Sequence, residues 1–144
     1  MKYLLFSLDK SEYAVDVSCI QSVIEYEGAA SLPSQVSCLR GIVDVRGRLV
    51  PLYDLRIKLG ITAKEPDIES RVIIVEAQKN DEIGLVGALV DGVSGVFELP
   101  EEDEMPMTGA AELFAEGELI GFSRVEERII AKLSPTALTS GFAR

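Results

Sequence analysis

Apolar and polar residues alternate in short runs along the chain, and the runs have the length of β-strands. Residues 3–8 and 13–17 are apolar-rich and flank the polar residues 9–12, which is the pattern of a β-hairpin. The same pattern recurs at 71–77 with 83–90, and again at 119–125 with 128–133. The sequence therefore predicts a mainly β protein built from hairpins.

A further hairpin is predicted in the middle of the chain, where residues 42–45 and 49–52 flank the turn Arg46-Gly47-Arg48. Gly47 can supply the positive φ that a short hairpin loop needs. Pro51 cannot donate a ladder hydrogen bond, so the return strand is predicted to lie at a sheet edge or to end there. Asp54 is a plausible N-cap for a short helix over residues 55–59, which Gly60 would end.

After the first predicted hairpin, apolar residues recur at helical spacing. Val17, Ile20, Val23 and Ile24 recur at intervals of three and four, which predicts a short helix or a helical turn. Residues 62–70 are polar and contain Pro66, so they are predicted to be a connector. One more helical turn is predicted over residues 134–138, opened by Pro135.

The chain contains a weak internal duplication. The pattern of residues 20–25 recurs at 93–98, and the pattern of residues 41–50 recurs at 121–130. Two successive units of hairpin, helical turn and hairpin predict two small closed β structures packed side by side. The copies differ at one turn, where Arg46-Gly47 in the first corresponds to Glu126-Glu127 in the second.

Charge is unevenly distributed over the 144 residues, whose formal net charge is −10. Residues 36–60 hold five bases and two acids, whereas eight carboxylates between 98 and 118 have no basic residue among them. We interpret the acidic run as a solvated loop. So small a basic region argues against nucleic-acid binding, which requires a broad basic face.

Candidate catalytic and metal-binding residues are few. There is no histidine, and Cys19 and Cys38 fit no metal-ligand spacing, so both are predicted to be buried or partly buried small apolar residues. Asp44 and Asp54 could form a carboxylate pair, but Asp54 stands where a helix cap is needed. We therefore predict no catalytic residues, no enzyme activity, no metal and no cofactor. A small β-barrel that binds a ligand remains an alternative from the strand pattern alone.

No segment of the sequence has the length or composition of a membrane span or a targeting signal. The first apolar run lasts only from residue 3 to residue 8 before Asp9 interrupts it. We accordingly predict a cytoplasmic protein without direct membrane insertion.

Two blocks of the sequence are distinctive. The first contains Arg46-Gly47, Pro51, Asp54-Leu55 and Gly60, and the second is the run V-D-G-V-S-G-V at residues 90–96. Both resemble the CheW family, the coupling proteins of bacterial and archaeal chemotaxis arrays. The resemblance covers residues 3–133 and implies two SH3-like five-stranded β-barrel subdomains, packed side by side, with short helices. It implies one CheW-like domain over residues 1–144. The approximate subdomains are 1–68 and 69–144, and terminal strands can be exchanged between them.

The resemblance also implies a function. Members of the family are scaffolds that couple the cytoplasmic tip of a methyl-accepting chemoreceptor to the regulatory domain of a CheA-type histidine kinase. An alternative is the same scaffold in a receptor array with a non-flagellar output. Residues for the kinase contact are left unassigned. Carried over by position, the receptor-facing groove comprises Ile20, Val23, Gly41, Arg46, Gly47 and Val96. The apolar spacing of Ile20, Val23 and Val96 is equally typical of positions in the core, which is the alternative for these three.

Overall fold

A computed structural model describes residues 1–31, 38–79, 82–100 and 118–139. Most of the described residues lie in β-strands, and the helices have three or four residues each. The strands are β1 (Lys2–Leu8), β2 (Ser11–Asp16), β3 (Ile20–Glu25), β4 (Leu39–Val45), β5 (Arg48–Asp54), β6 (Arg71–Lys79), β7 (Glu82–Val90), β8 (Gly92–Glu98), β9 (Leu119–Val125) and β10 (Arg128–Leu133). The helices are η1 (Val17–Cys19), α1 (Leu55–Lys58) and α2 (Thr136–Thr139).

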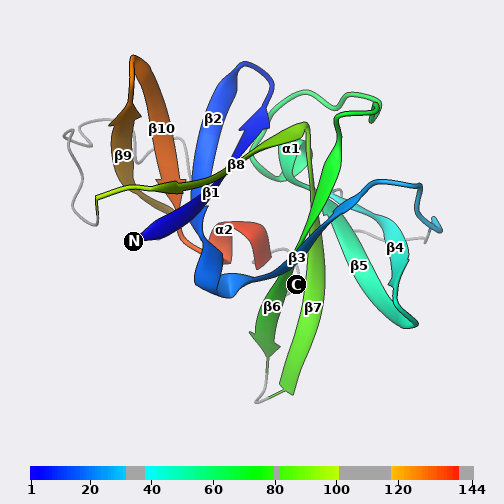
Figure 1. Ribbon diagram of the computed structural model, residues 1–144. Coiled ribbons are helices and arrows are strands. Elements are labelled where there is room, and N and C mark those ends of the chain that lie inside the picture. The colour runs from blue at the N-terminus through cyan, green and yellow to red at the C-terminus, as the bar shows by residue number, and fades with distance from the viewer. Residues whose placement is uncertain (32–37, 80–81, 101–117, 140–144) are drawn as a thin grey trace.

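The strands form two five-stranded sheets that lie side by side with α2 between them (Figure 1). Sheet A has the order β8-β1-β2-β10-β9, and sheet B has the order β3-β6-β7-β5-β4. This confirms the predicted fold class, mainly β with two SH3-like five-stranded units and short helices. Each sheet combines strands from both sequence ranges, 1–68 and 69–144, and that approximate division stays a prediction.

The predicted duplication is visible in the topology. The two sheet orders match strand for strand, with β8 of sheet A at the place of β3 in sheet B and β9 at the place of β4. Gln21 in β3 is an extra residue without a pairing partner, and its counterpart in the second copy, Ser94 in β8, is another. Arg40 in β4 and Ile120 in β9, which occupy corresponding positions of the two copies, are a second such pair. Each sheet therefore bends at corresponding β-bulges.

The helical prediction for residues 17–24 is wrong beyond η1. Residues 20–25 form the edge strand β3, and their counterparts at 93–98 form the edge strand β8. The bulges explain the error. One extra residue in a strand changes the spacing of apolar side chains on one face from two residues to three, which is also a helical spacing. Pairing with β6 and β1 then supplies the backbone hydrogen bonds of the two strands.

The prediction of a sheet edge at Pro51 is also wrong, since β5 lies between β4 and β7. Proline is accommodated because the pairing with β7 begins only at Leu52, so Pro51 needs no donor on that side. The other local predictions hold. Asp54 caps α1 by accepting a hydrogen bond from the Arg56 N–H, and α2 begins directly after Pro135.

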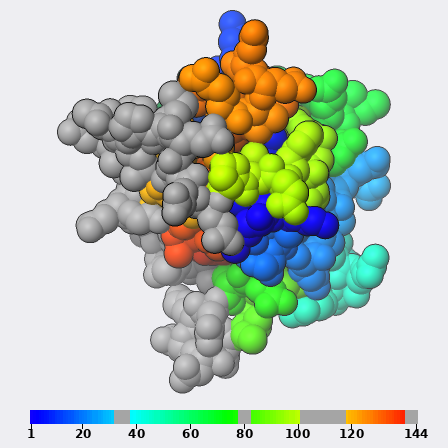
Figure 2. Space-filling model, turned by 60° about the vertical axis from the view of Figure 1, so that its left-hand side comes forward, coloured from blue at the N-terminus to red at the C-terminus, as the bar shows by residue number. Residues whose placement is uncertain are grey.

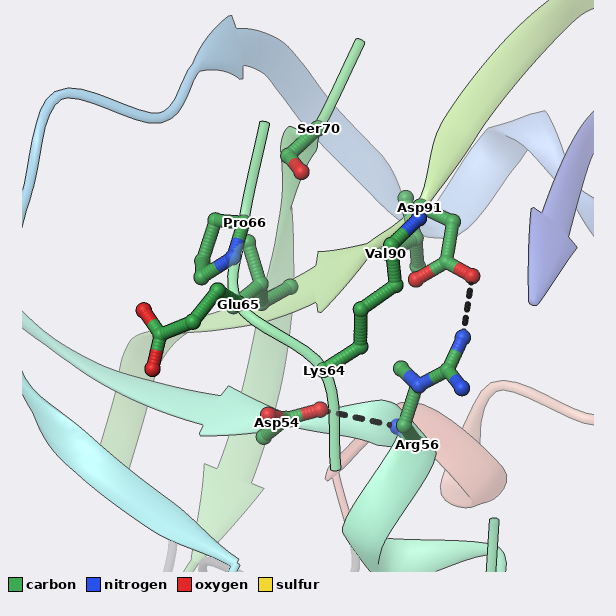
Figure 3. A pocket seen from close by; sticks show the side chains of 9 residues that line it. Asp54, Arg56, Lys64, Glu65, Pro66, Ser70, Val90 and Asp91 are labelled. Atoms are coloured by element: carbon green, nitrogen blue, oxygen red, sulfur yellow. Dashed lines mark hydrogen bonds and ion pairs between the residues drawn. The ribbon is translucent and has the colours of Figure 1, made fainter. Parts of the chain in front are cut away.

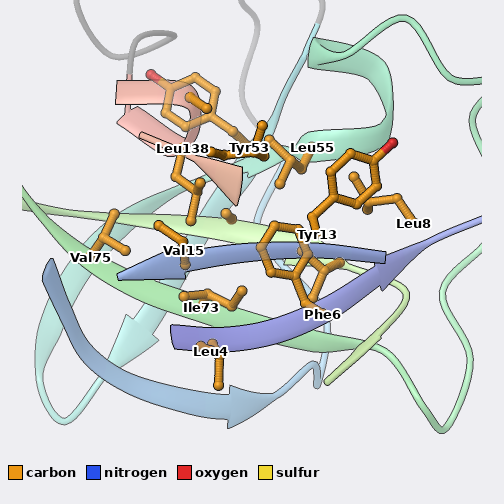
Figure 4. Close-up of a cluster of buried hydrophobic side chains, with 14 of the residues drawn as sticks. Leu4, Phe6, Leu8, Tyr13, Val15, Tyr53, Leu55, Ile73, Val75 and Leu138 are labelled. Carbon is orange, nitrogen blue, oxygen red and sulfur yellow. The ribbon is translucent and has the colours of Figure 1, made fainter. Parts of the chain in front are cut away.

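One apolar core joins the two sheets. Leu4, Phe6, Tyr13 and Val15 of sheet A meet side chains of sheet B, α1 and α2 in it, as Figure 4 shows. Among them, the rings of Phe6 and Tyr13 stack with centroids 5.7 Å apart. The contacting side chains include Tyr53, Leu55, Ile73, Val75 and Leu138. The sheets therefore share one interior. Two smaller clusters of buried apolar side chains each lie on one sheet, the first on sheet B and the second on sheet A.

Ser123 is fully buried on β9, and its hydroxyl has no hydrogen-bond partner in the described structure. Its counterpart in the first copy of the duplication is the buried Val43. Because an unpaired buried hydroxyl retains its desolvation penalty, Ser123→Ala should raise the free energy of unfolding by about 1 kcal/mol. Urea unfolding measures the change, with Ser94→Ala at an exposed site as the control. A less stable Ser123 variant would contradict the prediction.

Candidate functional site

The β4–β5 hairpin ends in a two-residue turn that projects into solvent. Both central residues have positive φ, 53° at Arg46 and 83° at Gly47, as a type I′ turn requires. Asp44 stabilises the turn, because its Oδ1 accepts a hydrogen bond of 2.8 Å from the Gly47 N–H. The positive φ predicted for Gly47 is confirmed, and Arg46 shares the left-handed conformation.

Most basic side chains of residues 36–60 form ion pairs within the molecule. Three of the five basic side chains are ion-paired, which leaves Arg46 and Arg48 exposed at the tip of the hairpin. The site therefore offers two arginines rather than a basic face. The ion pairs are Arg40 with Asp54 at 3.2 Å, Arg56 with Asp91 and with Asp9 at 3.4 Å, and Lys58 with Glu118 at 2.8 Å.

Asp54 and Arg56 line a small pocket at the start of α1 (Figure 3). The buried Asp54 carboxylate accepts from the Arg56 N–H and pairs with Arg40, whereas Asp44 lies at the exposed hairpin end. The two carboxylates therefore have separate structural partners. The pocket has a volume of about 10 Å³, which is room for one water molecule.

Gly41 lies where the two edges of sheet B approach each other. Beyond β3, Ala30 forms an isolated bridge to Ile42, with two hydrogen bonds of 2.9 Å. A Cβ on Gly41 would lie 2.3 Å from the carbonyl oxygen of Ala30, and its φ of 152° is rarely adopted by residues with side chains. Gly41 thus has a role in closing the sheet.

Ile20, Val23 and Val96 lie on the two edge strands. Ile20 is half-buried and packs against the shared core, so it contributes to the fold. Val23 on β3 and Val96 on β8 are counterparts in the duplication, with 37% and 54% of their surface exposed. In Figure 2, β8 (yellow-green) lies at the surface above the dark-blue β1. These two valines are available to a partner.

The six predicted receptor residues do not form one cluster. They lie on the β3 edge, along β4 with its turn, and on the β8 edge of the other sheet. Arg46 lies one residue beyond the end of β4 and five residues after Gly41, a separation of at most roughly 17 Å at ~3.4 Å per residue. An elongated partner such as a helical hairpin could span such a surface, whereas a small ligand could not.

A polar hollow of about 350 Å³ lies where the connector before β6 meets the start of β8. Ser7, Glu69, Arg71 and Ser94 are among the residues that line it, together with Val93. None of the six predicted receptor residues lines this hollow.

Two exposed aliphatic residues, Leu49 and Ile129, were not predicted as site residues. They lie at corresponding positions of β5 and β10, next to the two hairpin tips, and 73% and 53% of their surface is exposed. Their exposure follows from strand alternation, because neighbouring Val50 and Ile130 point into the interior. Strand alternation, together with the constant offset of 80 residues between the two copies, is the signal that could have identified Leu49 and Ile129.

The cysteines are buried or partly buried, as predicted. Burial raises the pKa of the Cys19 thiol to about 11, and its Sγ donates to the Asp16 carbonyl oxygen at 3.1 Å. The thiol is thus protonated at neutral pH and is a poor nucleophile. Within the described residues, no group of three or more acidic or cysteine side chains could hold a metal ion. No helix of the described part is long and apolar enough to cross a membrane.

Comparison with known proteins identifies the family. The model of the CheW-like domain matches residues 2–142. The chain belongs to the CheW family. A CheW chemotaxis protein of Thermotoga maritima is 32% identical over 130 residues, which are 90% of this chain and 82% of the relative. The CheW of Klebsiella aerogenes is 29% identical over 129 residues, 90% of this chain and 75% of the relative.

A solved structure supports the same fold. The crystal structure of the scaffolding protein TtCheW from Thermoanaerobacter tengcongensis superposes with a TM-score of 0.76 at 24% identity. The match covers 92% of this chain and 82% of that one. Membership of the CheW family places this chain among the scaffold and adaptor proteins of chemotaxis.

Proposed function

We propose that this chain is a cytoplasmic scaffold that couples a chemoreceptor to a CheA-type histidine kinase. The observation that carries the proposal is the pair of matching hairpins, β4–β5 and β9–β10, whose tips lie at opposite ends of the molecule (Figure 1). Each places an exposed aliphatic side chain beside its turn. Two separate contact surfaces on one rigid body suit a protein that holds two partners together.

The charges of the hairpins are reversed at two pairs of corresponding positions, while Arg48 and Arg128 are basic in both copies. Arg46 in the first turn corresponds to Glu126 in the second, and the exposed Asp44 corresponds to the exposed Arg124. Opposite charges around an apolar centre give orientation and selectivity to a protein contact. We propose the kinase contact at the β9–β10 end, around the exposed Ile129, which leaves the β4–β5 end to the receptor.

The receptor contact is proposed for the surface that includes the Arg46-Gly47 tip and the two edge strands. Val23 and Val96 supply exposed apolar contacts there, and Arg46 supplies a charge that reaches beyond the backbone. An amphipathic helix is recognised by such a combination of apolar contacts and a polar rim. Ile20 and Gly41 support this surface from within the fold.

Ile129→Asp tests the kinase contact. If Ile129 lies at the centre of a docking surface, a buried unpaired carboxylate should weaken binding to the kinase regulatory domain at least tenfold, about 1.4 kcal/mol. Calorimetric titration of the purified proteins measures the affinity. Ile68→Asp is the matched control, since Ile68 is 91% exposed on the connector, away from both hairpins. Equal affinity for the parent and for both variants would exclude this end of the molecule as the docking surface.

A further inference from the structure

The four-residue helix α1 connects the two sheets electrostatically. It follows β5 of sheet B, yet both of its basic side chains pair with acids on elements of sheet A. Arg56 reaches Asp91, which joins β7 to β8, and Asp9 in the β1–β2 turn. Lys58 reaches Glu118, directly before β9. We propose that α1 is a clasp that fixes the orientation of sheet A relative to sheet B.

Arg56 makes the more extensive set of contacts. Its side chain is 8% exposed, and its guanidinium pairs with both aspartates while Nε donates to the Thr62 carbonyl oxygen at 2.8 Å. The aspartates are themselves held, because the Asp9 N–H donates to Asp91 Oδ2 at 2.6 Å. A planar guanidinium that serves three acceptors permits little rotation of one side against the other.

Lys58 and Glu118 form the second contact of the clasp, with side-chain exposures of 10% and 9%. The Glu118 carbonyl oxygen also accepts from the Ser134 N–H, directly after β10, at 2.8 Å. The acidic partner is therefore fixed to β9 and β10 of sheet A. The partners of Arg56 and the partner of Lys58 lie next to different strands of that sheet, so together these three ion pairs oppose rotation as well as separation.

The shared apolar core is a less directional restraint than the clasp. Hydrophobic contact is largely non-directional, so it opposes separation of the sheets more than it opposes a change of angle. A buried ion pair contributes little net stability because desolvation offsets its attraction, but it demands a defined geometry. The clasp thus acts on orientation, and the inference does not depend on the proposed function.

Distance measurements between two spin labels test the clasp. Arg48→Cys on sheet B and Glu127→Cys on sheet A are exposed labelling sites, used in a background with Cys19→Ala and Cys38→Ala. Two variants open the clasp, Arg56→Met and the double variant Lys58→Met/Glu118→Leu. Both variants should remain folded and give a broader, shifted distribution of distances between the two spin labels. Arg56→Lys should give an intermediate distribution, because lysine keeps the positive charge but lacks the planar guanidinium that bonds several acceptors at once.

Glu12→Gln is the control, because it removes an ion pair that lies within sheet A, between β2 and β10. It should leave the distance distribution unchanged. An unchanged distribution in the two folded clasp variants would overturn the proposal and assign the orientation to the core. Should Arg56→Met fail to fold, the double variant decides, and loss of folding in both would also overturn it by making α1 a requirement for folding.

Discussion

Gly41→Ala is expected to destabilise the protein by roughly 3 kcal/mol, within the range for overpacking combined with backbone strain. The new Cβ would lie 2.3 Å from the Ala30 carbonyl oxygen, which is itself fixed by its hydrogen bond to the Ile42 N–H. Relief of the collision requires the bridge that closes sheet B to break. Urea unfolding followed by circular dichroism measures the loss.

Gly47→Ala is the control that distinguishes the effect of a steric collision from the effect of backbone strain. Gly47 has a φ of 83°, but nothing lies within 4 Å of its Cβ position, so only the strain of about 1 kcal/mol should appear. A Gly41 variant as stable as the Gly47 variant would show that Ala30 can move aside. If the expected difference is found, any loss of receptor binding on substitution of Gly41 reports a damaged sheet rather than a lost contact.

Arg46→Glu should abolish most receptor binding while the protein stays folded. Arg46 is exposed, and no hydrogen bond or ion pair within the described residues engages its guanidinium, so the free energy of unfolding should change by less than about 0.5 kcal/mol. Loss of an arginine anchor costs about 1–3 kcal/mol of binding free energy, and charge reversal adds repulsion. A pull-down with receptor cytoplasmic fragments, beside a thermal melt, measures both quantities.

Arg46→Asn is the matched control for the turn. Asparagine tolerates the positive φ of this position better than arginine does, so the variant should be at least as stable as the parent. Its binding to the receptor should nevertheless be weaker than that of the parent, because the guanidinium is lost. Wild-type receptor binding by Arg46→Glu would show that the tip does not contact the receptor. Unfolding of Arg46→Glu would instead assign Arg46 a structural role.

Local chemistry made the hairpins and the helix cap predictable. Gly47 in the turn, Asp54 before α1 and the alternation along β5 each act within a few residues, and such signals can be read from one sequence. The β-bulges at Gln21 and Ser94 could not be predicted, because an extra residue becomes evident only against a paired strand. That is why two edge strands were predicted as helical turns.

The site was predictable only where it lies on local structure. The exposure of Arg46 follows from the hairpin, and it was predicted. The burial of Arg56 and Lys58 was not predicted, since their partners Asp91 and Glu118 lie 35 and 60 residues further along the chain. Gly41 likewise depends on Ala30, whose approach is set by closure of the sheet. Pairing over such separations is determined by the tertiary fold.

Co-sedimentation tests the coupling function most directly. Membranes that contain a methyl-accepting receptor are mixed with a CheA-type kinase from the same organism, with and without this protein, and the kinase in the pellet is measured. The kinase should sediment with the receptor membranes far more when the protein is present, and Arg46→Glu and Ile129→Asp should each reduce this amount. The same amount of pelleted kinase with and without the protein would contradict it.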